Sequence, residues 1–191
     1  MLGGSYMRFL QCIPFRCRLI ARVLVVLALS GFGVYHQTAS GVAAAARCIR
    51  EANDHTLSVR VEARYAFASL LLNRDAPDKR QAARERFQKL QASLGQSKAA
   101  LEGLSTPLLA PQADKEALTL ARERAREAID ETDQAFAMTL SLIDDRSHDE
   151  ETNRAIGETV AHSTELVKES NAALLPLVQP YGLEELPVLP Q

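Results

Sequence analysis

The sequence predicts an all-α protein in which an N-terminal transmembrane helix precedes an up-down-up-down antiparallel four-helix bundle. One observation is an apolar run at residues 19–35, with arginines before it or at its start and no acidic residue ahead of it. The other is an apolar stripe with alternating three- and four-residue spacing, which recurs in four later segments of similar length. That spacing is typical of helices that pack along one face in a bundle.

The apolar run predicts a signal anchor at residues 19–40. Arg8, Arg16, Arg18 and Arg22 give the N-terminal side its positive charge, which favours a cytoplasmic N-terminus and transfer of the following chain across the membrane. The run is short for a span and long for a signal-peptide core, so a cleaved signal peptide stays open as the alternative. The expected organisation is a basic cytoplasmic segment at 1–18, the anchor, a bundle at 41–178 and a proline-rich tail at 179–191.

Composition favours helices and excludes one class of partner. The chain has 191 residues, a net charge of −2, no tryptophan and only 5% aromatic residues. Without a basic surplus, binding to nucleic acid has no electrostatic support. The residues beyond the anchor are numerous enough for one ordinary domain with its own core.

Proline and glycine positions divide the bundle into four predicted helices. They cover residues 41–73, 77–104, 111–143, and 147 to just before Pro176 or Pro180. Ser147 and Glu150 have the spacing of a capping box at the start of the fourth. The stripe of the first helix consists of Ile49, Ala52, Thr56, Val59, Ala63, Ala66 and Leu70. The stripe of the fourth consists of Ile156, Val160, Ser163, Val167, Ser170, Leu174 and Leu177.

These stripes are rich in alanine, serine and threonine, as are those of the other two helices. Small side chains bury less apolar area per layer than leucine does, so the bundle is expected to be marginally stable alone. A homodimer is the predicted remedy.

Three segments carry a resemblance to a known family: FRCRLI at residues 15–20 with its apolar run, LSVRVEAR at 57–64 and SLLLN at 69–73. With the order of basic segment, span and four matching helices, the chain resembles the periplasmic sensor domain of bacterial methyl-accepting chemotaxis receptors of the aspartate and serine class. The resemblance implies a single-pass protein of the bacterial inner membrane with the bulk of the chain in the periplasm. It departs from the family after the fourth helix, where the proline-containing tail cannot form a second span.

Arg60 and Arg64 are the candidate ligand-binding residues. They lie one helical turn apart and flank the apolar stripe of the first helix. In the resembled receptors, arginines of this helix hold the carboxylate of an amino-acid ligand, and a planar guanidinium suits a carboxylate because it can bind both oxygens. Further arginines of the family pattern would fall near Tyr65 and Ser69, so the set is incomplete. The alternative is that both arginines are solvated or pair with Glu62.

Other polar residues are weaker candidates. Thr132, Asp133 and Thr139 on the third helix, with His162, Ser163 and Thr164 on the fourth, line a polar pocket in one interpretation and simply loosen the core in another. His55 and His162 reach similar heights on adjacent helices, but no haem or metal motif accompanies them or the remaining His36 and His148. The acidic group Asp144, Asp145, Asp149, Glu150 and Glu151 lacks the glycine turn of a calcium loop. No metal or cofactor is therefore predicted.

No nucleophile motif or phosphate-binding loop is present, so no enzymatic activity is predicted. Cys48 is the one cysteine beyond the predicted span; it is expected to be a small buried residue, with an intermolecular disulfide as the alternative. The function expected from the resemblance is a membrane-anchored sensor-like bundle that binds a small amino acid or organic acid, or pairs with a receptor partner. The alternative is a structural or protein-interaction module of the cell envelope without a small-molecule ligand.

Overall fold

The computed structural model describes residues 15–72, 76–145 and 150–183, without the side chains of residues 15–36, 71–72 and 144–145. This part of the chain forms four helices: α2 (Phe15–Leu72), α3 (Pro77–Glu102), α4 (Gln112–Asp145) and α5 (Glu150–Val178). The prediction of an all-helical protein with four helices is thereby confirmed. Ser147, the predicted start of the capping box, lies outside the described residues.

The chain divides into two compact units, Met1–Ser40 and Gly41–Gln191. In the described part of the chain, no helix is both long enough and apolar enough to cross a membrane. The anchor expected at residues 19–40 depends on side chains at 19–36 that lie outside the described residues, so it stays a prediction.

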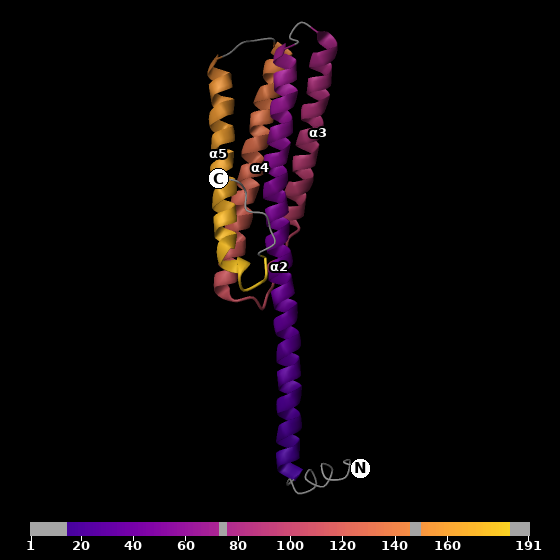
Figure 1. Cartoon of the computed structure of the whole chain (residues 1–191), viewed down its shortest axis with the longest axis vertical. Coiled ribbons are helices and arrows are strands. Elements are labelled where there is room, and N and C mark those ends of the chain that lie inside the picture. Colours follow the sequence, from indigo (N-terminus) through magenta and orange to yellow (C-terminus); the bar gives the residue numbers. More distant parts are fainter. Residues whose placement is uncertain (1–14, 73–75, 146–149, 184–191) are drawn as a thin grey trace, which may run out of the picture. The chain divides into compact units, whose positions relative to one another are not determined.

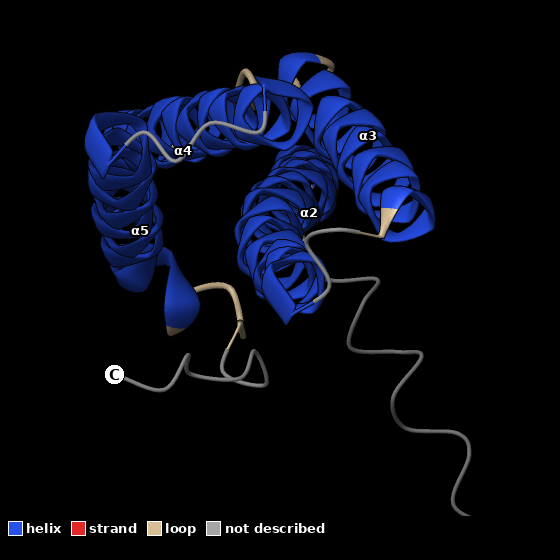
Figure 2. Cartoon of the chain, turned by 90° about the horizontal axis from the view of Figure 1, so that it is seen from above, coloured by secondary structure: helices blue, strands red, loops and turns tan. Residues whose placement is uncertain are grey.

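Within the second unit, consecutive helices run in opposite directions along a common axis (Figure 1). Seen end-on, α4 lies between α3 and α5 (Figure 2). Proline and glycine mark the boundaries as predicted: Pro77 occupies the first turn of α3, where its missing N–H costs nothing, and Gly103 follows the last residue of that helix.

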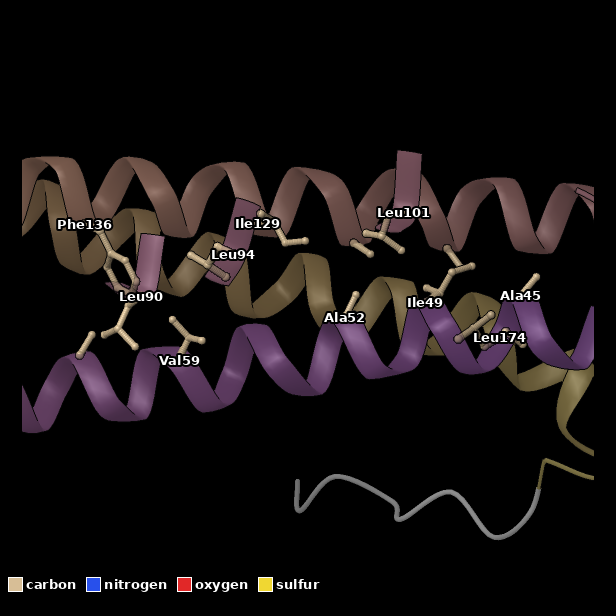
Figure 3. Packing of buried hydrophobic residues seen from close by; sticks show 14 of the residues in the cluster. Ala45, Ile49, Ala52, Val59, Leu90, Leu94, Leu101, Ile129, Phe136 and Leu174 are labelled. Carbon is tan, nitrogen blue, oxygen red and sulfur yellow. The ribbon is translucent and has the colours of Figure 1, made fainter. Parts of the chain in front are cut away.

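The core follows the predicted stripes. All four helices contribute apolar side chains, among them Ile49 of α2, Leu94 of α3, Ile129 of α4 and Leu174 of α5, as Figure 3 shows. Six polar residues are buried with them, which agrees with the expected loose, alanine- and serine-rich core. These are Asn53, Thr56, Thr132, Thr139, Ser163 and Ser170.

A polar relay joins three of the helices across this core. The side-chain amide of Asn53 on α2 donates to the hydroxyl of Ser170 on α5, at 2.8 Å. That hydroxyl in turn donates to the backbone carbonyl of Ala121 on α4, at 2.7 Å. Small residues make this possible, because only a short side chain lets the helices approach closely enough for such contacts.

The end of α5 differs from the prediction in two respects. The helix passes through Pro176 and ends at Val178, which a proline permits near a C-terminus because only one intrahelical hydrogen bond is lost. Gly182, at φ 63°, then reverses the chain so that the N–H of Leu183 donates to the carbonyl of Val178 at 2.9 Å. Leu183 is buried, so the first residues of the predicted tail belong to the core.

Candidate ligand-binding site

Arg60 and Arg64 lie on the rim of the core-facing surface of α2. Val59 and Ala63, their neighbours in the sequence, are buried, and the helical period therefore places both arginines at the edge of the packed face. Arg60 is partly buried, whereas Arg64 is exposed. The arginine pair predicted from the sequence is thus brought to one place in the structure.

Both arginines line a cavity of about 660 Å³ that opens to solvent and is bounded by all four helices. Cavities of roughly 300–1,000 Å³ are typical of small-molecule sites. None of the side chains that line it carries a carboxylate. The cavity therefore presents two positive charges and no negative one.

The interpretation that Glu62 neutralises the arginines is wrong. The carboxylate of Glu62 pairs instead with the guanidinium of Arg86 on α3, at 3.0 Å. Arg64 has no ion-pair partner among the described residues. The neighbouring acidic residue thus binds on the other side of α2 from the cavity.

Arg60 reaches across the cavity to α5. Its Nη1 donates to the backbone carbonyl of Val160 at 3.2 Å, and this is its one hydrogen bond in the part of the chain that the structure describes. A guanidinium has five N–H donors, so most of its capacity remains for a ligand. Burial lowers the pKa of Arg60, and the positive charge of Arg64 lowers it further.

The floor of the cavity is apolar and aromatic. Phe87 of α3 and Phe136 of α4 are both buried, and their rings meet edge to face with centroids 5.3 Å apart. Phe67 of α2, which is partly buried, adds a third ring to the lining. Such an edge-to-face pair is a favoured arrangement of aromatic rings.

The α5 wall explains why the space is open. Ile156 and Val160 are the first two residues of the predicted stripe, yet both are only partly buried and line the cavity. Between them lies Gly157, and a Cβ placed there would meet no atom within 4 Å. Without a side chain at this position, α5 contributes too little volume to fill the space opposite α2.

The remaining polar candidates separate into two groups. Thr139 and Thr164 line the cavity, but each hydroxyl donates to a carbonyl of its own helix, Ala135 at 2.8 Å and Val160 at 2.9 Å. Thr132 and Ser163 bond to each other at 2.8 Å in the buried contact of α4 with α5.

The other two polar candidates also lie away from the cavity lining. Asp133 accepts from Gln91 of α3 at 2.9 Å, and His162 is exposed. Of this set, only the two threonines belong to the candidate site.

The described residues bring no metal site together. His55 contacts the hydroxyl of Ser93 on α3 at 3.1 Å and does not pair with His162. No group of three or more histidine, cysteine, aspartate or glutamate side chains suited to a metal ion is found there. The side chains of His36, His148, Asp144, Asp145 and Asp149 lie outside the described residues.

Cys48 is a free, partly buried thiol. Burial raises its pKa, and the negative charge of Glu51 raises it further. A raised pKa lowers the fraction of thiolate, which is the reactive form. This agrees with the expectation of a packed rather than a reactive cysteine.

Sequence reasoning missed the aromatic floor and the role of Gly157. An isolated glycine inside a helical pattern is a recognisable signal, and its place between two stripe residues could have indicated the opening. Beyond this geometry, the chain stands alone: no protein-family model, no curated protein and no solved structure matches it.

Proposed function

We propose that the chain is a membrane-anchored, sensor-like helical bundle that binds a small carboxylated solute in the cavity beside Arg60 and Arg64. One observation carries the proposal: two arginines line a cavity of ligand size that contains no carboxylate. The arginine-rich start of the apolar run supports the membrane anchor and a periplasmic position of the bundle.

The arginine pair is an unfavourable arrangement unless an anion joins it. Like charges one helical turn apart destabilise a helix by about 0.2–0.5 kcal/mol, and the charge of Arg60 is partly withdrawn from water. A carboxylate bound by both guanidinium groups relieves this repulsion and accepts charge-assisted hydrogen bonds. Residual instability in the unliganded protein thereby becomes affinity for an anionic ligand.

A thermal-melt screen of the full chain against amino acids and small organic acids tests this proposal. A ligand at about 100 times its dissociation constant adds roughly 2.7 kcal/mol to the free energy of unfolding. We expect a clear rise in melting temperature with at least one carboxylate, and loss of that rise in Arg60→Ala. Arg86→Ala is the matched control, because Arg86 pairs with Glu62 outside the cavity.

If Arg60→Ala kept the full response to the carboxylate, the assignment of the site to these arginines would be lost. If no carboxylate shifted a cooperative melt, solute binding itself would be contradicted.

A second candidate function, a helical module that pairs with another copy or with a receptor partner, is favoured by exposed apolar residues on α2. Val61 and Tyr65 lie one turn apart and are 54% and 72% exposed. Burial in a dimer would remove this surface from water. Sedimentation equilibrium of the wild type and Tyr65→Lys distinguishes the cases: weaker association of the variant supports pairing through this surface, and unchanged association argues against it.

A further inference from the structure

The lining of the cavity divides into one charged side and one apolar side. The charged side is Arg60 and Arg64, and the apolar side includes Phe67, Phe136 and Ile156. The two threonine hydroxyls already donate to carbonyls of their own helices. Strong hydrogen-bond donors are therefore concentrated at the arginines.

This division limits which carboxylates fit. An amino-acid ligand brings an ammonium group, which needs acceptors, and no carboxylate lines the cavity to receive it. A dicarboxylate brings a second charge, which would lie against apolar walls if the first occupies both arginines. Moving an unpaired charge from water to an apolar surface is strongly unfavourable.

The aromatic floor favours a ring in the remaining space. Phe87 and Phe136 already meet edge to face, and Phe67 lines the same cavity. Aromatic rings gain from offset or edge-to-face contacts beyond the area they bury. The open space at Gly157, where a Cβ would meet nothing within 4 Å, leaves room for such a body beside α5.

We infer that the ligand is a monocarboxylate with an apolar, aromatic body, its carboxylate held by Arg60 and Arg64 and its ring packed against Phe67 and Phe136. This inference rests on the proposed function and narrows it to one class of solute, the arylalkanoates. Gly157 then determines specificity, because its missing side chain leaves the volume that the ligand body occupies.

Isothermal titration of the full chain with four related probes tests the ligand class. Hydrocinnamate has the carboxylate and the ring, hydrocinnamamide lacks the charge, phenylalanine adds an ammonium group, and succinate replaces the ring with a second carboxylate. We expect hydrocinnamate to bind, and each of the other three to bind at least about tenfold more weakly, since each loses a charge-assisted contact or leaves a charge unpaired.

A pair of glycine variants tests the position of the ligand body. Gly157→Leu places a side chain in the cavity, whereas Gly95→Leu does the same on α3 away from it, and neither Cβ meets an atom within 4 Å. We expect Gly157→Leu to reduce hydrocinnamate affinity by about tenfold or more and Gly95→Leu to leave it unchanged. Melting curves of both variants verify that they fold.

The outcomes separate this inference from the proposal beneath it. Binding of succinate or phenylalanine in preference to hydrocinnamate overturns the aromatic monocarboxylate and leaves solute binding intact. Equal binding of hydrocinnamate by wild type and Gly157→Leu overturns the placement of the ring. Absence of binding by any carboxylate in the wider screen removes the proposed function and this inference together.

Discussion

The two halves of the bundle use the same helices and the same heptad spacing but pack differently. In the half that contains Ile49, Leu101 and Leu174, apolar side chains meet across the centre (Figure 3), and Leu183 folds back into the core. We call this the filled half. The other half, which contains Arg60 and Phe136, encloses the cavity, and we call it the cavity half.

The difference between the halves arises mainly on α5. In the filled half its stripe residues from Ser163 to Leu177 are buried, whereas Ile156 and Val160 in the cavity half are only partly so. A helix that supplies full layers at one end and a glycine at the other closes the bundle at one end only. The comparison indicates that stability and binding are assigned to different ends of the same four helices.

The largest expected effect is loss of a large apolar side chain from the filled half. Leu101 is fully buried, so Leu101→Ala should lower the free energy of unfolding by about 2–5 kcal/mol. Ile156→Ala in the cavity half should cost about 1 kcal/mol or less, because its side chain is partly exposed and already borders open space. Urea unfolding of both variants measures the contrast, and equal losses would break the distinction between the halves.

The polar relay of the filled half should give the next effect. Ser170→Ala removes the hydroxyl that joins Asn53 to the carbonyl of Ala121, and leaves buried groups without that partner. We expect a loss of about 1–3 kcal/mol. Thr164→Val in the cavity half removes only a hydroxyl bonded to its own helix, and a change below about 0.5 kcal/mol is expected. Comparable losses would show that the relay contributes nothing special.

Glycine replacement should raise stability in the cavity half. Gly157 lies inside α5 and its position has room for a methyl group, so Gly157→Ala should add about 0.5–1 kcal/mol through helix propensity. Gly95→Ala on α3 should add a similar amount for the same reason. Thermal melts of the two variants measure this, and destabilisation by Gly157→Ala alone would contradict the open space at that position.

The smallest effect concerns the pH dependence of stability. Burial raises the pKa of Asp54 from its ordinary 3.8, with Arg50 opposing and Glu51 adding to the shift, and its buried Oδ1 has no hydrogen-bond partner among the described residues. A raised folded-state pKa means that ionisation opposes folding: the penalty is full above the raised value and absent below 3.8.

Asp54→Asn should therefore gain stability over wild type at neutral pH. The gain should shrink as pH falls through the raised pKa towards 3.8. Urea midpoints of the two proteins across this range measure the difference. A difference that did not change with pH would remove Asp54 as its source.

The sequence predicted much of this architecture because heptad spacing determines which face of each helix points inward. Ile49, Val59, Leu94 and Leu174 are buried as expected. Spacing does not determine how closely the helices approach, which depends on the summed size of side chains from several helices. The cavity therefore could not be predicted from α2 alone, although Arg60 and Arg64 could be identified there.

The return of the chain at Gly182 was missed for a related reason. A tail containing several prolines indicates only that the helix has ended. Whether the next apolar residue enters the core depends on the space left at that end of the bundle, and Leu183 occupies it. Both misses concern volume shared among helices rather than the pattern within one.

The most direct test of the central claim is the thermal unfolding of wild type and Arg60→Met, each with and without hydrocinnamate and succinate. The account predicts opposite effects: Arg60→Met raises the stability of the unliganded protein, by about 0.5 kcal/mol from lost repulsion with Arg64, and abolishes stabilisation by the carboxylate. A variant that is less stable without ligand and still responds to the carboxylate would show that Arg60 supports the fold rather than a ligand, and would contradict the account.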